Sequence, residues 1–507
     1  MKDSGIGSSA FDGLHKMNAS STKPTVAVTG GGLAGLAAAC ALANAGFRVT
    51  LFEKRPYLGG RASSYEHPGT GEVVDNCQHV LLGCCTNLID FYRRTGVESK
   101  IRWYDRMFFL EPGGRSSVIQ PSFLPAPLHT APSFLRASCL SFSDKLSIAR
   151  AMMALARVPR NRGNSHSQRS VEGAAAPDTD SFLDWLRRHR QTDRAIDRFW
   201  KTILVSALNE DLDRISISYG AQVMRESFLK SPAAGRMGLP TVPLTELYNA
   251  AGSYIGARGG EVKCRTSLEA FRPESSGVSL QLSGDEKIFD YLVLALPFNT
   301  LAQTLPTTPE AEPLREKLSH LASSPITGIH LWFDRQISAL DHAVLLDRKI
   351  QWMFHKSRIL QRSAEFSTRG TGSAPEAGSY VELVVSSSKG LVEKSRAEIV
   401  DLAVSELGEF FPAAREAKLL KSTVIKEVHA TYSPRPGLDT FRPAAPSPWP
   451  RVFLAGDWTA TGWPATMEGA VRSGYMAAQA LAHGAYSAKS EFLVPDLPPT
   501  GFMRLFA

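Results

Sequence analysis

The first regular pattern in the chain is a pair of short apolar runs on either side of an uncharged stretch. Residues 25–29 (TVAVT) and 48–53 (RVTLFE) are typical of buried parallel strands. Between them, residues 33–45 (LAGLAAACALANA) are rich in Ala and Leu and are followed by Gly46, so they predict a helix packed on a sheet. The order strand, helix, strand predicts a βαβ unit at the start of the fold.

Further patterns predict a mixture of helices and strands along the rest of the chain. Amphipathic spacing predicts helices over 180–200, 216–229 and 466–483. Apolar runs predict strands at 261–271, 278–282, 291–296 and 451–455, with two more, at 326–333 and 380–386, in a region that otherwise has a helical pattern. Residues 120–142 are rich in Pro, Phe and Leu. They cannot form one long helix, and they are too apolar for a solvated linker.

The composition is that of a globular protein with a sizeable core. The chain has 507 residues, of which 43% are hydrophobic and 21% charged, so it is neither disordered nor a disulfide-stapled miniprotein. The net charge of +8 is compatible with anionic lipid or nucleic acid, but a solvated basic surface is the favoured explanation. No basic run interleaved with aromatic residues is visible, so nucleic-acid binding has no support.

Cysteine usage and the N-terminal residues indicate a cytoplasmic protein. The six cysteines form no C-x-x-C pair and have no zinc spacing to histidine, so we expect neither a disulfide framework nor a metal site. Residues 1–23 are rich in Ser, Gly and Lys without an apolar core, which predicts a disordered leader rather than a signal peptide. No run of 18 apolar residues spans a membrane, although peripheral attachment remains open.

A glycine-rich motif follows the first predicted strand directly. Gly30, Gly32 and Gly35 form a G-x-G-x-x-G, in which the glycines allow a tight turn, close approach of a pyrophosphate and close helix packing. The following helix would offer the N–H groups of its first turn, from Leu33 and Ala34, to the phosphates. Glu53 ends the second predicted strand, where a carboxylate binds ribose hydroxyls. The sequence therefore predicts a dinucleotide site.

Two later segments narrow the dinucleotide to FAD by resemblance. Residues 56–61 (PYLGGR) follow Glu53 and Lys54 and resemble the G-G-R signature of the amine oxidase and phytoene desaturase superfamily of FAD proteins. This resemblance implies that Gly60 and Arg61 contact the pyrophosphate. Residues 453–458 (FLAGDW) resemble the segment whose acid holds the ribityl chain, and residues 466–474 resemble the helix that faces the flavin pyrimidine. Further cofactor contacts implied by the resemblance are Gly456, Asp457, Met467 and, at the adenine, Leu268.

The resemblance extends to one family within this superfamily. Residues 75–84 (DNCQHVLLGC), 200–209 (WKTILVSALN) and 456–470 (GDWTATGWPATMEGA) are similar to blocks of the hydroxysqualene dehydroxylases, also called squalene-associated FAD-dependent desaturases. The similarity covers about residues 25–483. Cys77 departs from the family pattern, which has Gly there, and it would strain any backbone that needs a positive φ.

The family resemblance implies a reduction of hydroxysqualene to squalene. Loss of water from an allylic alcohol leaves a cation that a hydride from reduced FAD can quench in a dry apolar tunnel. The electron donor that reduces the flavin is not indicated by the sequence. The candidate catalytic residues are Gln78, His79 and Glu468, of which His79 can donate a proton near neutral pH. Alternatively, His79 is a core histidine bonded to backbone and Glu468 has a capping or positioning role.

The resemblance also implies the fold class and a division into domains. We expect an α/β protein in which a Rossmann-type FAD-binding domain carries an inserted α+β substrate domain. Residues 157–180 and 362–378 have almost no large apolar residues and are expected to be flexible insertions. The expected FAD-binding domain comprises residues 24–100, 240–300 and 425–485, the substrate domain comprises 101–239 and 301–424, and residues 486–507 form a C-terminal tail.

Two alternative functions and one location complete the predictions. A carotenoid-type desaturase of the same fold would oxidise a polyene with oxidised FAD, and the flavin motifs do not exclude it. A non-catalytic carrier of prenylated proteins shares the fold, but the intact flavin motifs argue against it. Because an isoprenoid substrate is nearly insoluble in water, we expect peripheral contact with the inner face of the cell membrane. The residues expected there are Phe123, Leu124, Phe134, Leu135, Leu140, Arg136 and Lys145.

Overall fold

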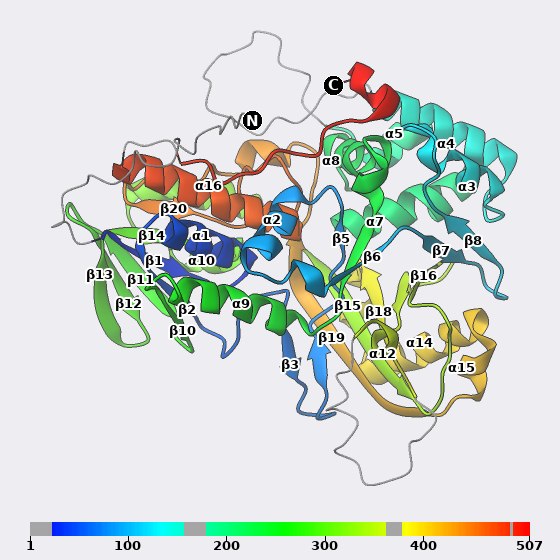
Figure 1. Cartoon of the computed structure of the whole chain (residues 1–507), viewed down its shortest axis with the longest axis horizontal. Coiled ribbons are helices and arrows are strands. Elements are labelled where there is room, and N and C mark those ends of the chain that lie inside the picture. Colours follow the sequence, from blue (N-terminus) through cyan, green and yellow to red (C-terminus); the bar gives the residue numbers. More distant parts are fainter. Residues whose placement is uncertain (1–22, 157–178, 361–377, 487–489, 507) are drawn as a thin grey trace, which may run out of the picture.

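The computed structural model describes residues 23–156, 179–360, 378–486 and 490–506. The expected leader at 1–23 and the expected insertions at 157–180 and 362–378 lie almost entirely outside the described residues. Two α/β halves lie side by side along the longest axis of the molecule (Figure 1). Two long strands of the right-hand sheet, β15 (Ser323–Phe333) and β19 (Leu419–Tyr432), reach toward the boundary between the halves (Figure 1).

The first half is built on a five-stranded parallel sheet with the order β10-β2-β1-β14-β20. The strands predicted at 25–29 and 48–53 form as expected, and those predicted at 291–296 and 451–455 are shorter. The strand bounds are β1 (Thr25–Thr29), β2 (Arg48–Glu53), β10 (Glu261–Cys264), β14 (Tyr291–Leu294) and β20 (Val452–Leu454). The predicted Rossmann-type fold is confirmed, because strands distant in sequence align in parallel around β1.

Each face of this sheet is covered by a different layer. Helices α1 (Leu33–Asn44), α9 (Leu244–Gly256) and α16 (Met467–Tyr486) pack on one face, where the alanines of α1 allow close approach. A three-stranded antiparallel sheet covers the other face together with two helices. The strands of this layer are β11 (Leu268–Pro273), β12 (Val278–Leu282) and β13 (Asp285–Phe289), and its helices are α10 (Phe298–Thr304) and α11 (Glu312–Ser319).

The single strand predicted at 261–271 is wrong, because two strands of different sheets occupy these residues. β10 ends at Cys264 and β11 begins at Leu268. Between them, Arg265 has a φ of 56°, a left-handed conformation that no strand continues through. The Thr266 N–H donates to the Glu53 carbonyl at 2.9 Å, so the connection is tied to the end of β2. This break places Leu268 next to the dinucleotide motif.

The second half is built on a seven-stranded mixed sheet with the order β19-β15-β18-β17-β16-β7-β8. The strands predicted at 326–333 and 380–386 belong to it, and helices flank them as expected, but the residues between them form two further strands. Its other strands are short or half exposed, which weakens their apolar signal. The bounds are β7 (Met107–Leu110), β8 (Ser116–Ile119), β16 (His342–Leu345), β17 (Trp352–Phe354) and β18 (Ser379–Ser386). β19 crosses the domain boundary expected at residue 425.

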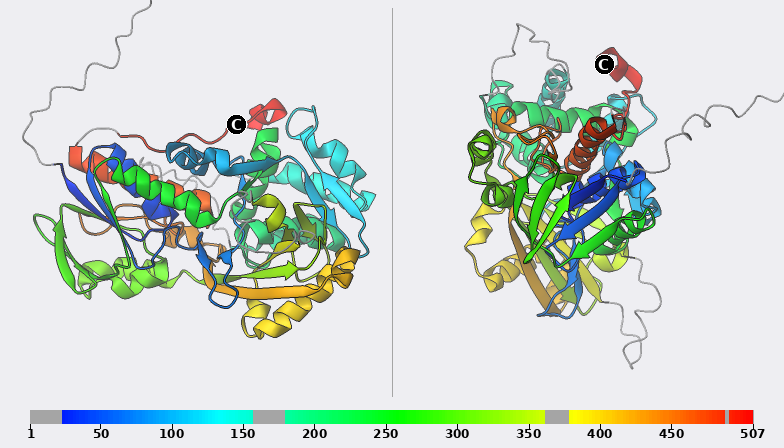
Figure 2. Two further views of the ribbon diagram at one scale, coloured as in Figure 1. Left: turned by 60° about the horizontal axis from the view of Figure 1, so that its bottom comes forward. Right: turned by 90° about the vertical axis from the view of Figure 1, so that its left-hand side faces the viewer.

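Helices cover this sheet and close the far end of the molecule. α14 (Arg396–Phe410) and α15 (Pro412–Glu416) pack on its outer face (Figure 2). The single helix predicted at 180–200 is wrong: Arg190 is left-handed with a φ of 51°, and Thr192 caps a new helix by accepting from the Ala195 N–H at 3.1 Å. The helices here are α3 (Ala131–Arg136), α4 (Phe142–Leu155), α5 (Phe182–Arg188), α6 (Asp193–Ala195), η3 (Ile196–Lys201), α7 (Thr202–Leu208), α8 (Ile217–Met224) and η4 (Arg225–Leu229).

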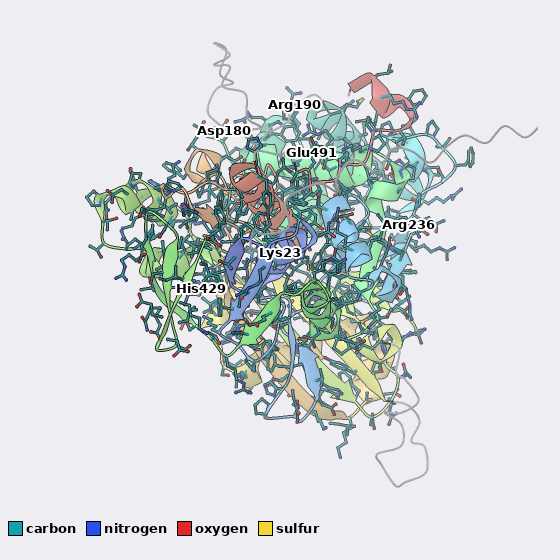
Figure 3. All side chains as sticks on the ribbon, turned by 60° about the vertical axis from the view of Figure 1, so that its left-hand side comes forward. Lys23, Asp180, Arg190, Arg236, His429 and Glu491 are labelled. Carbon is teal, nitrogen blue, oxygen red and sulfur yellow. The ribbon has the colours of Figure 1, made fainter. Side chains whose placement is uncertain are left out.

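Smaller elements connect the two halves. The sheets β3-β4 and β5-β9-β6 lie between the halves. Arg236, beside β9, is labelled in Figure 3. It donates to Asp105 at 2.8 Å. No helix in the described part of the chain is long and apolar enough to cross a bilayer. The remaining bounds are β3 (Ser64–Glu66), β4 (Val73–Asp75), β5 (Leu81–Leu82), β6 (Ile101–Tyr104), β9 (Met237–Pro240), α2 (Thr86–Arg94), α12 (Lys356–Ile359), α13 (Lys389–Val392) and η9 (Gly501–Phe506).

Candidate active site: a dinucleotide cradle that opens into an apolar cavity

A cavity of about 540 Å³ lies between the two halves and is lined by residues of both. One end is formed by the glycine-rich turn after β1, the end of β2 and the segment before α16. The other end is formed by side chains of the seven-stranded sheet and of α7, α8 and η4. The carboxyl ends of the parallel strands therefore open onto the cavity, which is where open α/β sheets bind ligands.

The glycine-rich turn has the shape that a dinucleotide requires. Gly30 has a φ of 106°, and a Cβ there would overlap the carbonyl oxygen of Ala295. A Cβ at Gly35 would overlap the Gly30 carbonyl, so α1 can pack on β1 only with glycine there. At Gly32, a Cβ would meet only the Gly60 Cα, at 3.9 Å. Protein atoms therefore do not require glycine at this position, and the open space suits a phosphate group.

The first turn of α1 presents backbone donors to this space. No side chain caps the helix at Gly32, and no acidic residue lies in the first turn. Leu33 and Ala34 line the cavity, so the positive end of the helix dipole points at it. The residues present therefore fit the diphosphate of FAD.

Glu53 lies at the cavity with its carboxylate held by backbone donors. Its Oε2 accepts from the Gly31 N–H at 2.6 Å and its Oε1 from the Arg55 N–H at 2.8 Å. These bonds fix the carboxylate beside the glycine turn, as expected for a group that receives ribose hydroxyls. Lys54 and Leu268 line the cavity at the same end. Sequence reasoning missed Arg55 and Thr266, which also line it, because neither belongs to a recognisable motif.

Arg61 and Asp457 face each other across the cradle. The Arg61 Nη2 donates to the Asp457 Oδ1 at 2.7 Å, and its Nη1 donates to the Ala430 carbonyl at 2.6 Å. Burial disfavours the charge of Arg61, but Asp457 and Glu427 nevertheless keep the Arg61 pKa above its ordinary value. Gly60 with a φ of 61° and Gly456 with a φ of 154° form the backbone beside the pair. The cradle thus has a fixed cation for a diphosphate and an acid for ribityl hydroxyls.

A buried arginine that the sequence did not single out shapes the segment after Asp457. Arg442 is 4% exposed, and its guanidinium donates to the carbonyls of Asp457 at 3.1 Å and Trp463 at 2.8 Å. It also lies over the ring of Tyr432, 5.1 Å from the centroid. Arg442 therefore fixes the course of residues 457–463 beside the cavity. No local motif surrounds it in the sequence.

The start of α16 faces the cavity as expected. Thr466 caps this end, since its Oγ1 accepts from the Gly469 N–H at 3.1 Å. Met467 lines the cavity and accepts a long hydrogen bond of 3.8 Å from the Tyr248 hydroxyl. Trp463 and Pro464 line the cavity beside them. This helix end can stabilise negative charge on a bound flavin ring.

Glu468 is a buried residue of the cavity wall whose carboxylate has several donors. Its Oε1 accepts from Arg472 Nε at 2.7 Å and from the Asn87 side chain at 3.0 Å. Its Oε2 accepts from the Leu88 N–H at 2.8 Å. The carboxylate thus joins the N-terminus of α2 to α16, which is the geometry of the positioning alternative. The catalytic role of Glu468 stays a prediction.

His79 lies in the cavity wall in a neutral, proton-accepting form. Its Nδ1–H donates to the Cys77 carbonyl at 2.7 Å, which leaves a lone pair on Nε2. Burial lowers the His79 pKa below its ordinary value. Near neutral pH the ring is therefore neutral and bonded to backbone, as the alternative expectation for His79 has it, and its role in proton transfer stays a prediction. Cys77 does not have a positive φ, so the departure from Gly leaves the backbone unstrained.

Gln78 connects the cavity wall to a buried charge cluster. Its Oε1 accepts from Lys356 Nζ at 2.8 Å, and its Nε2 donates to the His79 carbonyl at 3.1 Å. Lys356 is 1% exposed and also donates to Asp75 Oδ2 at 2.6 Å. Glu382 lies 3.5 Å from the same Nζ. Sequence reasoning missed Lys356 and Glu382, although a lone acid on the inward face of an apolar strand was a usable signal for Glu382.

The far half of the cavity is mostly apolar. Phe109, Ile203, Val223, Trp352 and Phe354 are among the side chains that line it. Polar side chains also line it: Thr202 and Ser206 on α7, Ser386 on β18, and Gln222, Glu226 and Ser227 on α8 and η4. The cavity therefore suits a long hydrocarbon beside the flavin cradle, with polar groups at a few places in its wall.

Comparison with known proteins agrees with this geometry. The family model described as flavin containing amine oxidoreductase matches residues 33–482. The 15-cis-phytoene desaturase of Synechococcus elongatus is 28% identical over 90% of this chain and 95% of its own. The tomato (Solanum lycopersicum) 15-cis-phytoene desaturase is 29% identical over 91% of this chain and 78% of its own.

Among solved structures, an oxidoreductase from Methanosarcina mazei has the same fold. It superposes with a TM-score of 0.65 at 18% identity, over 89% of this chain and 98% of its own. Gly32, Glu53, Arg61 and Asp457 line the cradle, and their chemistry fits FAD. The chain thus belongs to the flavin-containing amine oxidoreductases, and its cofactor is FAD.

Proposed function

We propose that this protein exchanges hydride between FAD and a long isoprenoid chain. The observation that carries the proposal is the continuity of one cavity, which has a polar dinucleotide cradle at one end and an apolar half at the other. When bound, FAD supplies a two-electron hydride acceptor or donor. The apolar side chains would align the hydrocarbon and exclude water from the reacting carbon. The phytoene desaturase relatives also support an isoprenoid substrate.

Desaturation is the first candidate for the direction of the reaction. It removes a hydride and a proton from neighbouring carbons, so it needs a hydride acceptor and a base. His79 is neutral and has a free Nε2 lone pair, as a base requires. The curated relatives named as desaturases favour this direction. The enzyme would then need an electron acceptor to reoxidise the flavin.

Reductive dehydroxylation of hydroxysqualene is the second candidate. The block at 75–84 and the segment at 456–470 resemble hydroxysqualene dehydroxylases. One structural observation favours it: Gln222, Glu226 and Ser227 give the apolar wall a polar stretch that a pure polyene would not need. In this reaction the hydroxyl oxygen leaves with a proton as water, and an electron donor of another protein or a small molecule must first reduce the flavin.

Product analysis under two redox conditions distinguishes the candidates. Oxidised holoenzyme is incubated with phytoene and a quinone, and photoreduced holoenzyme is incubated anaerobically with hydroxysqualene. A more unsaturated carotene in the first mixture supports desaturation, and squalene in the second supports dehydroxylation. Conversion in neither mixture rejects both candidates. Flavin reduced with deuterium at N5 should place one deuterium in any squalene that forms.

We also propose peripheral contact with the inner face of the cell membrane. Phe123 is 97% exposed, and Leu135, Phe142 and Leu505 are also exposed. The C-terminal η9 joins this surface, because the Phe502 N–H donates to the Ala126 carbonyl at 2.8 Å. Among the residues expected to contact lipid, Leu140 is buried and Phe134 packs on Phe199, so neither is available. Arg136 and Arg504 are exposed here and would favour anionic headgroups.

Flotation with anionic vesicles tests this contact. We expect the holoenzyme to float with the vesicles and the double variant Phe123→Asp, Leu135→Asp to stay behind. Ile288→Asp is the matched control, because Ile288 is 66% exposed on β13 in the other half of the molecule. The proposed surface is rejected if the unmodified protein, the double variant and the control float equally. It is also rejected if the unmodified protein does not float with the vesicles.

A further inference from the structure

A buried cluster of three ionisable side chains lies directly behind the cavity wall. Asp75 ends β4, Lys356 begins α12 and Glu382 lies on β18, and each is at most 4% exposed. The three segments are distant in sequence, and the cluster joins the β3-β4 sheet to the seven-stranded sheet. Burying two carboxylates with one ammonium is costly unless the charges balance. The cluster therefore needs one proton to be neutral.

Hydrogen bonding indicates which carboxylate is ionised. Asp75 accepts from Lys356 Nζ at 2.6 Å, from Ser64 Oγ at 2.5 Å and from the Leu244 N–H at 3.2 Å. Burial alone would raise the Asp75 pKa, but these donors lower it below its ordinary value. Glu382 has weaker donors: the Gln78 backbone N–H and the Lys356 ammonium approach it without good hydrogen-bond geometry, and the Lys356 contact is the longer one, 3.5 Å. Asp75 and Lys356 form the charged pair, and Glu382 carries the proton.

The surroundings of Glu382 support this assignment. His330 lies opposite Glu382 across β15 and β18, and its Nδ1 is 2.8 Å from the Tyr380 hydroxyl. Burial lowers the His330 pKa to about 3, so this ring supplies no positive charge. Burial raises the Glu382 pKa to about 8 despite Lys356. The titratable groups that face Glu382 are Lys356 on α12, Asp75 on β4, Cys77 after β4, His330 on β15 and Tyr380 on its own strand.

Gln78 is the link between this cluster and the flavin cavity. Lys356 Nζ donates to both Asp75 and the Gln78 Oε1, so one ammonium fixes the carboxamide in the wall. If Glu382 loses its proton, the ammonium gains a second anionic partner 3.5 Å away and its bond to Gln78 weakens. We propose that Lys356 is a positioning residue for Gln78 in the cavity wall. We propose further that the protonation state of Glu382 controls the strength of the hydrogen bond from Lys356 to Gln78. The inference depends on FAD binding and not on which isoprenoid reacts.

A pH titration of the bound flavin tests the proposal. The visible absorbance of the holoenzyme is recorded between about pH 6 and pH 10, and we expect a change with a midpoint near pH 8. Glu382→Gln keeps the shape of the side chain and is neutral at every pH, so the variant should show the low-pH spectrum over the whole pH range. Gln78→Leu should also abolish the change, because it removes the link to the wall. Glu409→Gln, which alters an exposed pair with Arg348, should titrate as the unmodified protein does.

Each outcome decides the proposal. Loss of the transition in Glu382→Gln and in Gln78→Leu, with its retention in Glu409→Gln, supports it. A transition with the same midpoint in Glu382→Gln overturns it, as does an unmodified holoenzyme that shows no transition in this range. Lys356→Met leaves the Asp75 carboxylate buried without its cation, so the double variant Lys356→Met, Asp75→Asn is the better probe of Lys356. It should lose the transition while Glu382 is still present.

Discussion

Arg61 donates a 2.7 Å hydrogen bond to Asp457, although 396 positions separate the two residues. The bond joins the segment after β2 to the segment after β20, which are the two ends of the flavin cradle. Because Arg61 also donates to the Ala430 carbonyl, its guanidinium is fixed before any cofactor binds. A preorganised cation loses little side-chain entropy when it meets a diphosphate.

Asp457→Ala should weaken FAD binding by about tenfold or more, since a hydrogen bond to a charged group contributes about 1.5–3 kcal/mol. The variant removes the group that orients Arg61 and the acceptor for ribityl hydroxyls. The dissociation constant is measured by flavin fluorescence on the deflavinated protein. Asp105→Ala is the control, because Asp105 pairs with Arg236 on an exposed surface. Equal affinities for both variants would contradict the assignment.

Gly32→Val should largely abolish copurification of FAD, because the side chain would fill the open space beside the N-terminus of α1. The fold should survive, since a Cβ at Gly32 meets only one protein atom, at 3.9 Å. Flavin content per protein is measured by absorbance after denaturation. Gly256→Val is the matched control, because Gly256 has open space and lies away from the cavity. Full flavin content in Gly32→Val would be incompatible with the cradle.

Glu468→Ala should reduce the free energy of unfolding by roughly 3 kcal/mol, because it leaves buried donors of α2 and α16 without their acceptor. A positioning role predicts that activity falls only in proportion to flavin content. Activity per bound flavin should therefore stay within about twofold for Glu468→Gln, which retains an acceptor oxygen. If activity per bound flavin fell a hundredfold in Glu468→Gln while stability stayed normal, Glu468 would have a catalytic role.

Thermal stability should fall as pH rises toward 8, and Glu382 should be one source of the loss. Its folded-state pKa of about 8 lies above the ordinary carboxyl value. The stabilisation is complete below the unfolded-state pKa and is lost as pH rises through the folded-state pKa. The slope from one such group is about 1.4 kcal/mol per pH unit. Melting temperatures of Glu382→Gln should decline less between pH 5 and about pH 8, and parallel curves would contradict the assignment.

Much of the cofactor half could be predicted from the sequence because its determinants are local. The strand–turn–helix at residues 25–45 requires particular glycines, and Glu53 follows at a fixed spacing. The substrate half was less predictable. β16 and β17 have four and three residues, too few for a clear period, and β19 is half exposed. The helix predicted at 180–200 failed because the cap at Thr192 was not recognised.

The residues that support the site could not be found from local patterns. Arg442 and Lys356 act through contacts with segments far away in the chain, and each has an unremarkable neighbourhood in the sequence. His79 was identified, but its protonation depends on burial and on the Cys77 carbonyl, which only the folded chain brings together. Glu468 was identified as well, but its hydrogen bonds to α2, which favour a positioning role, come from a distant segment of the chain.

The most direct test of the central claim, hydride exchange between FAD and an isoprenoid, is the flavin redox state in a single anaerobic turnover. Oxidised holoenzyme is mixed with phytoene and photoreduced holoenzyme with hydroxysqualene, and flavin absorbance and product are followed together. We expect the flavin to change redox state in one mixture at the rate at which product appears, with one flavin consumed per double bond formed or hydroxyl lost. An unchanged flavin in both mixtures, or product formed without a change in the flavin, would contradict the claim.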